Sequence, residues 1–119
     1  MLVVEDDPSI LKLMEITLKK VCDVVLAENG KIAFQKIILK QPDLIISDNM
    51  MPEMTGFELK LELNKSNDTK NIPFMFLSSI GDSETQKKAY DLGIVDYLVK
   101  PISPIFIRDK VKNFFSTNK

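Results

Sequence analysis

The chain has 119 residues, a net charge of -1 and an apolar share of 45%, which together are typical of one ordinary globular domain. Lys and Arg total 16 and Asp and Glu total 17, so bulk charge gives no support to direct nucleic-acid or membrane binding. The sequence has no histidine and one cysteine, Cys22, which excludes histidine catalysis, histidine metal ligands and an internal disulfide. No apolar run is long enough to span a membrane, and we expect a soluble, cytoplasmic domain.

Short apolar runs alternate with longer amphipathic stretches along the chain. The runs are rich in β-branched and aromatic residues, which favours strands buried on both faces of a parallel sheet, and they cover residues 2–4, 24–26, 44–46, 74–77 and 95–99. Apolar residues at helical spacing predict helices between and after them, over residues 8–21, 30–38, 57–64, 83–92 and from 104 onward.

The stretch 57–64 is ambiguous. Phe57, Leu59, Leu61 and Leu63 alternate with polar residues, as in a strand. Leu59 and Leu63 are also four residues apart, and Glu, Lys and Leu favour helix. We predict a helix, because two parallel strands need a crossover at this point.

Five strand–helix units in succession predict an α/β fold, with an open parallel sheet and helices on both of its faces. We interpret residues 1–119 as one domain. The chain begins inside its first predicted strand and ends on polar residues, so we expect this domain to be a piece of a longer protein.

Reactive side chains follow four of the five predicted strands. Glu5 and Asp6 come after the first strand, Asp48 after the third, Ser78 after the fourth and Lys100 after the fifth. The carboxyl ends of parallel strands lie on one edge of a sheet, so these groups should meet there. Each has an ordinary explanation when taken alone, as a helix cap or a solvated loop residue, but their joint occurrence favours a site.

Crowded carboxylates repel one another unless a cation joins them, and oxygen ligands without histidine favour Mg²⁺. Mg²⁺ held in this way commonly binds a phosphoryl group, and a lysine and a hydroxyl add charge and hydrogen bonds for phosphoryl transfer. A carboxylate can itself attack phosphorus and form an acyl phosphate. The residue types therefore point to phosphoryl chemistry on a carboxylate.

The sequence resembles the receiver domains of response regulators, the CheY-like superfamily, over essentially the whole chain. The resemblance lies in the order and spacing of six stretches, residues 2–8, 27–30, 42–48, 51–56, 72–79 and 92–101. It implies a single-domain, flavodoxin-like three-layer sandwich with strand order 2-1-3-4-5. It also implies a regulatory phosphoacceptor domain of two-component systems, which is not an enzyme beyond its own phosphotransfer and autodephosphorylation.

By this resemblance Asp48 is the phosphoacceptor. Asp6 and Asp48 bind Mg²⁺ directly, the backbone carbonyl of Met50 is a further ligand, and Glu5 assists indirectly. Ser78 and Lys100 contact the phosphoryl group. The remaining implied roles are an aromatic switch at Tyr97 that moves with Ser78, and shaping of the site's loops by Pro52, Gly56 and a cis-bonded Pro101.

Three positions depart from the commonest pattern of the family. Ser78 stands where threonine is frequent, Ser79 replaces a small alanine, and Thr55 replaces an aspartate before the glycine. None of these changes removes an essential group, so we expect a site that can still be phosphorylated.

The resemblance implies that a partner histidine kinase or histidine phosphotransfer protein supplies the phosphoryl group. The face formed by the fourth helix, fifth strand and fifth helix then changes and controls an output domain or target protein. Ile105 and Phe106 are surplus to the core stripe of the last helix, and we interpret them either as end packing or as an apolar patch for a partner or a phosphorylation-dependent homodimer. Apolar Met50 and Ile80 predict slow self-dephosphorylation, because neither can orient water.

Three alternatives remain. A phosphohydrolase with an aspartate nucleophile would need a second carboxylate at position 50, where Met50 stands. A nucleotide- or flavin-binding domain would need a glycine-rich loop after the first strand, where carboxylates stand instead. The serious alternative is a pseudo-receiver, a docking module that works without phosphorylation.

Overall fold

The computed structural model describes residues 1–51, 53–101 and 103–117, in which strands and helices alternate as predicted. In chain order the elements are β1 (Leu2–Val4), α1 (Pro8–Leu18), β2 (Val25–Ala27), α2 (Gly30–Leu39), β3 (Ile45–Ser47), α3 (Gly56–Asn64), β4 (Phe74–Ser78), α4 (Ser83–Asp91), β5 (Asp96–Val99) and α5 (Pro104–Thr117). Strand boundaries differ from the predicted ones by about one residue, and α1 ends before the predicted residue 21. None of the described helices is long and apolar enough to cross a membrane.

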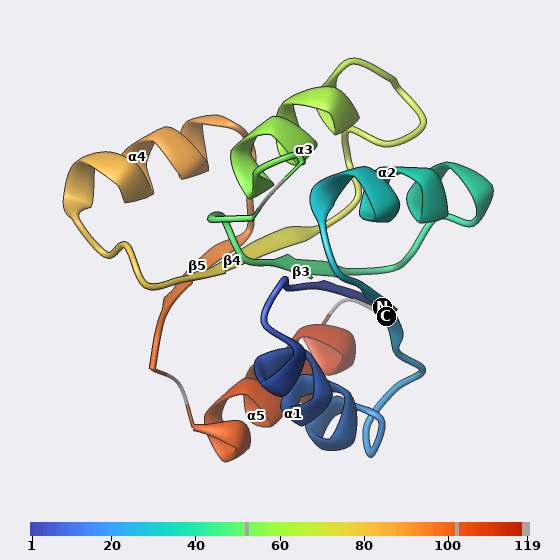
Figure 1. Cartoon of the computed structure of the whole chain (residues 1–119), viewed down its shortest axis with the longest axis vertical. Coiled ribbons are helices and arrows are strands. Elements are labelled where there is room, and N and C mark those ends of the chain that lie inside the picture. The colour runs from blue at the N-terminus through green and yellow to red at the C-terminus, as the bar shows by residue number, and fades with distance from the viewer. Residues whose placement is uncertain (52, 102, 118–119) are drawn as a thin grey trace.

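All five strands pair in parallel, in the order β2-β1-β3-β4-β5. Figure 1 shows α1 and α5 on one face of this sheet and α2, α3 and α4 on the other. This confirms the predicted flavodoxin-like three-layer sandwich. The strand order reverses at β1 and β3, and such a reversal places ligand sites at the carboxyl ends of the strands.

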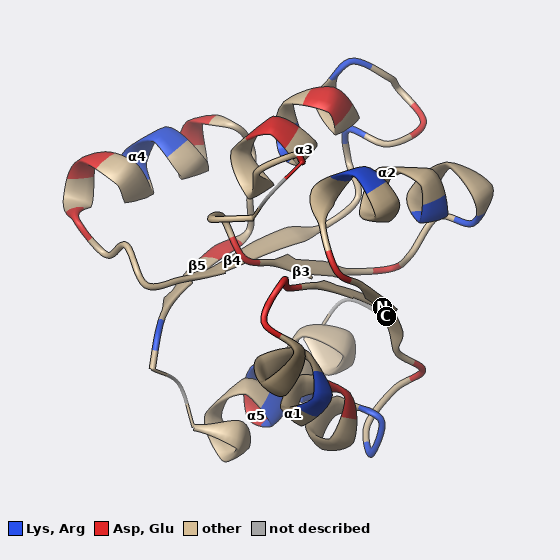
Figure 2. Ribbon diagram, in the orientation of Figure 1, with Lys and Arg blue, Asp and Glu red and all other residues tan. Residues whose placement is uncertain are grey.

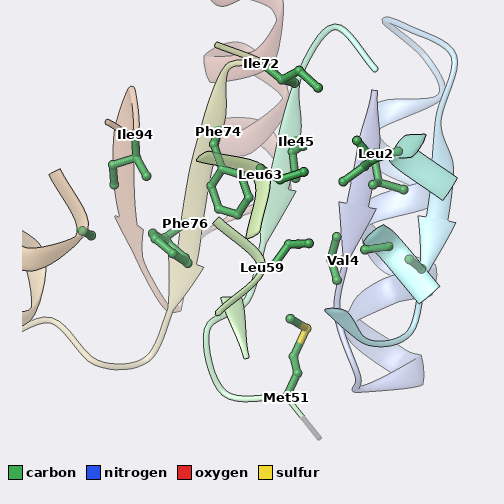
Figure 3. Close-up of a cluster of buried hydrophobic side chains, with 14 of the residues drawn as sticks. Leu2, Val4, Ile45, Met51, Leu59, Leu63, Ile72, Phe74, Phe76 and Ile94 are labelled. Carbon is green, nitrogen blue, oxygen red and sulfur yellow. The ribbon is translucent and has the colours of Figure 1, made fainter. Parts of the chain in front are cut away.

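Two apolar clusters fill the space between the sheet and its helices. Successive strand residues face opposite sides, so Leu2 and Val4 belong to the cluster under α2, α3 and α4, while Val3 belongs to the cluster under α1 and α5. Figure 3 shows the first cluster, in which Phe74 and Phe76 of β4 lie beside leucines of α3. The Phe74 and Phe76 rings stand edge to face, with their centroids 5.1 Å apart.

The prediction that every strand is buried on both faces is wrong for the two outer strands. Val25 of β2 is 49% exposed and Val99 of β5 is 39% exposed, whereas β1, β3 and β4 are buried throughout. An outer strand has only one neighbour, so the flanking helices cover it incompletely.

The ambiguous stretch is a helix because its start is well capped and its leucines pack at helical spacing. The Thr55 hydroxyl accepts the Glu58 N–H, and the Glu58 carboxylate accepts the Thr55 N–H, which is a complete capping box. Leu59 and Leu63 are fully buried, while Leu61 is 49% exposed. A strand would have placed all three leucines on one face.

Candidate functional site

The carboxyl edge of the sheet brings together the side chains that the sequence predicted. β1, β3, β4 and β5 are consecutive in the sheet, so the residues that follow them lie side by side. Asp48 follows β3, and its backbone is fixed to β1 because its N–H donates to the Val4 carbonyl at 2.9 Å. Its Oδ1 accepts the N–H of Asn49 at 2.8 Å.

Three carboxylates converge at this edge, and Figure 2 shows acidic residues in red directly after β1 and β3. One oxygen from each of Glu5, Asp6 and Asp48 lies within 4.8 Å of the others. Glu5 and Asp48 are 3% and 7% exposed, whereas Asp6 is exposed to solvent. Oxygen donors gathered at this spacing, with one side open to water, fit a hard divalent cation such as Mg²⁺ that keeps part of its water shell.

Lys100 joins the cluster from β5 and neutralises part of its charge. Its Nζ donates to Glu5 Oε1 at 2.7 Å and lies 3.6 Å from Asp48 Oδ2. Burial disfavours the ammonium, but the hydrogen bond to Glu5 and the charge of Asp48 outweigh burial and raise the pKa of Lys100. Burial also raises the pKa of Glu5 to about 7, although the Lys100 hydrogen bond acts in the opposite direction.

The loop after β3 is held tightly against the start of α3. The Gly56 N–H donates to the Asn49 carbonyl at 2.9 Å, and a Cβ at Gly56 would lie 2.4 Å from the Asp48 carbonyl oxygen. The buried side chain of Asn49 accepts the Phe57 N–H at 3.1 Å. Sequence reasoning missed Asn49; the available signal was an amide residue directly after the predicted phosphoacceptor.

One backbone residue links the predicted switch pair. Ser78 is fully buried, and its Oγ accepts the Ile80 N–H at 3.2 Å. The Tyr97 hydroxyl donates to the carbonyl oxygen of the same Ile80. The Tyr97 ring is 7% exposed and lies 5.9 Å from that of Phe76. The Tyr97 side chain is therefore turned inward in this structure.

The other predicted site residues flank this cluster. The Lys100–Pro101 peptide bond is cis, as the resemblance implied. The Met50 side chain is 59% exposed, Ile80 is half-buried and Ser79 is exposed. The predicted loop residue Pro52 lies outside the described residues.

Comparison with known proteins decides the family. The sequence model described as "Response regulator receiver domain" matches residues 1–112. The chain belongs to the response regulator receiver domain family. Among solved structures, the receiver domain of the Francisella response regulator 1452 superposes with a TM-score of 0.90 at 29% identity, covering 99% of this chain and 97% of that one.

Curated relatives of this receiver domain are much longer proteins. It is 31% identical over 110 residues to a "Probable cyclic di-GMP phosphodiesterase" of Vibrio cholerae, a match covering 92% of this chain and 25% of the relative. It is 34% identical over 118 residues to "Hybrid signal transduction histidine kinase D" of Dictyostelium discoideum, covering 99% of this chain and 8% of the relative. The chain thus spans a minor part of each relative. Receiver domains are regulatory parts of two-component signalling and bind Mg²⁺ at an acidic pocket.

Proposed function

We propose that this chain is a Mg²⁺-dependent phosphoacceptor switch in which Asp48 receives a phosphoryl group from a histidine kinase or a histidine phosphotransfer protein. The observation that carries the proposal is the convergence of Asp48, Lys100 and the Glu5–Asp6 pair at one sheet edge. A docking module that works without phosphorylation would have no need to bury Glu5 and Asp48 together, because like charges at close range are costly.

The proposed reaction is an in-line transfer. An oxygen of Asp48 bonds to phosphorus while the bond between phosphorus and the imidazole nitrogen of the donor breaks, and the electron pair leaves with the imidazole. Lys100, 3.6 Å from Asp48 Oδ2, is placed to balance the charge of the phosphoryl oxygens. Asp6, Asp48 and the Met50 carbonyl would hold Mg²⁺, with indirect help from Glu5, and the ion would supply further positive charge.

The switch would run through Ile80. In this structure the Ser78 hydroxyl accepts from the Ile80 N–H, and the Tyr97 hydroxyl donates to the Ile80 carbonyl. When the Ser78 hydroxyl donates a hydrogen bond to a phosphoryl oxygen, Ser78 Oγ moves towards the phosphoryl group. The hydrogen bond that Oγ accepts from the Ile80 N–H then weakens. A shift of Ile80 then changes the partner of Tyr97, so the two residues respond together.

The output surface would be the face formed by α4, β5 and α5. Several apolar residues are exposed there, namely Tyr90, Val95, Val99, Ile105 and Phe106. A hollow of about 470 Å³ lies between β5 and α5 and is lined by Tyr97, Val99 and Phe106. Tyr97 borders this hollow, so movement of its ring changes the surface offered to a target protein, an output domain or a second copy.

Self-dephosphorylation of this receiver should be slow. Met50 stands two residues after Asp48, and its side chain is exposed. Ile80 stands two residues after Ser78, and its side chain is half-buried. The Ile80 side chain has no polar atom and the Met50 thioether is only a weak acceptor, so neither can position a water molecule for attack on the acyl phosphate. Met50→Glu should therefore accelerate phosphate release.

The deciding experiment is intact mass after incubation with Mg²⁺ and acetyl phosphate, with Asp48→Asn as the matched control. We expect a gain of one phosphoryl group that needs Mg²⁺ and is absent in the variant. If neither acetyl phosphate nor a beryllofluoride mimic changed the mass or the NMR signals of Tyr97, the pseudo-receiver would be the better description.

A further inference from the structure

The outer strand β2 carries one residue whose backbone groups are directed away from the sheet. Val25 donates its N–H to the Met1 carbonyl at 2.9 Å, and the Ala27 carbonyl accepts the Glu5 N–H at 3.0 Å. Both residues therefore pair with β1. Successive residues of a strand direct their N–H and C=O groups to opposite sides, so those of Leu26 point to the free edge of the sheet.

Lys36 reaches this edge from α2. Its Nζ donates to the Leu26 carbonyl oxygen at 2.6 Å, although the lysine as a whole is exposed. It lies in the last turn of α2, the helix that follows β2 directly. The ammonium therefore occupies the acceptor that an added strand would use.

Lys36 also lines two hollows along β2. The first has a volume of about 390 Å³ and is lined in part by Val25, Leu39 and Lys36. The second has a volume of about 210 Å³ and is lined in part by Leu26, Ile32 and Lys36. Lys36 therefore lies beside both hollows, along the strand that a second copy would have to approach. Val25 and Leu39, which line the first hollow, are 49% and 87% exposed.

We infer that Lys36 prevents β2 from pairing with the β2 strand of a second copy of this chain. Exposed strand edges are sites of association, and lysines are one means by which proteins block them. A second copy is the fitting occupant because Leu26 offers one donor and one acceptor. Two such residues facing each other across a two-fold axis exchange both hydrogen bonds, as in an antiparallel pair. This inference is independent of the phosphoacceptor site, which lies on other strands.

The test compares Lys36→Met with Lys40→Met by sedimentation velocity over a series of concentrations. Methionine keeps most of the apolar stem of the lysine and loses the ammonium. Lys40 is the exposed C-cap residue of α2, so its variant matches the change in charge. A hydrogen bond to a charged group changes an equilibrium constant by about tenfold to a hundredfold, and we expect Lys36→Met to raise the self-association constant by at least about tenfold. Lys40→Met should sediment as the wild type does.

Two further measurements place any association at the β2 edge. The amide of Leu26 should gain hydrogen-exchange protection with rising concentration in Lys36→Met and not in the wild type. Adding Leu26→Pro removes the outward N–H, a change that an edge strand tolerates, together with a leucine side chain that packs on the cluster under α1 and α5, and it should reverse the association while the protein stays folded. Phosphoryl acceptance should be unchanged in Lys36→Met. The inference is overturned if Lys36→Met sediments as Lys40→Met does, or if it associates without protection of the Leu26 amide.

Discussion

The buried carboxyl of Glu5 should make the metal-free protein less stable as the pH rises, and Glu5→Gln isolates this effect. Glu5 is 3% exposed, and burial raises its pKa from 4.5 to about 7 against the opposing hydrogen bond from Lys100. A group whose pKa is higher in the folded than in the unfolded protein favours folding at pH values below 4.5. That contribution is lost as the pH rises through 7.

The size of the effect follows from the two pKa values. Each unit of difference corresponds to about 1.4 kcal/mol. Between 4.5 and about 7, the unfolding free energy of the wild type should therefore fall by about 3 kcal/mol relative to that of Glu5→Gln. Glutamine keeps the shape of glutamate, and its amide oxygen can still accept the bond that Lys100 makes at 2.7 Å. Above the higher pKa the variant should be the more stable protein.

The assay is urea unfolding of both proteins with a chelator present, from below pH 4.5 to above pH 7. Asp43→Asn is the matched control, because Asp43 is an exposed carboxyl that precedes β3 at the opposite end of the sheet. Mg²⁺ should restore more stability to the wild type than to Glu5→Gln, since a ligand stabilises the state that binds it. A difference between variant and wild type that stays constant over this range would refute the reasoning.

Three further substitutions have defined outcomes. Lys60→Met removes an ammonium whose pKa is lowered by burial. As the pH rises towards 10.5, the buried ammonium of the wild type loses its proton more readily than it does in the unfolded chain, so the unfolding free energy of the wild type should rise relative to that of the variant. Denaturant unfolding measures this difference. Tyr97→Phe loses the hydrogen bond from the hydroxyl to the Ile80 carbonyl, and this should lower the unfolding free energy by about 1 kcal/mol. The NMR signals of the aromatic ring at position 97 should then no longer change on phosphorylation. Gly56→Ala forces a Cβ to 2.4 Å from a carbonyl oxygen and should lower the unfolding free energy by about 1–3 kcal/mol or more, measured by denaturant unfolding beside the wild type.

The sheet and the composition of the site were predictable because both depend on local sequence. The runs that form β1, β3 and β4 are apolar throughout, as strands covered on both sides must be. Parallel pairing then places whatever follows each strand at the same edge, so Asp48 and Lys100 meet although they are far apart in the chain. That argument needs the order of residues and no side-chain geometry.

The link from Ser78 to Tyr97 was not predictable in this form. The resemblance implied that these two residues move together, but the intermediary is the backbone of Ile80, which accepts one bond and donates another. Backbone groups have no sequence signature, and their partners depend on the path of the loop after β4. For the same reason the sequence could not indicate that Tyr97 is already inside.

Lys60 shows how a correct secondary structure can still hide a side chain's environment. The sequence predicted a helix over 57–64, supported by the spacing of Leu59 and Leu63, and it gave no indication of where the side chain of Lys60 lies. In the structure Lys60 is 1% exposed, its Nζ donates to the Lys70 carbonyl at 3.1 Å and lies 6.0 Å from the centre of the Phe74 ring. Among the described residues no carboxylate forms an ion pair with it.

The position of Lys60 follows from the width of the buried face of α3. A helix that packs on a sheet buries a stripe wider than one row of residues, and Lys60, next to Leu59, falls within that stripe. Its long apolar stem can fill a core position while the ammonium reaches the chain that leads into β4. The carbonyl of Lys70 and the Phe74 ring compensate part of the cost of burial, and the lowered pKa of Lys60 reflects the part that they do not.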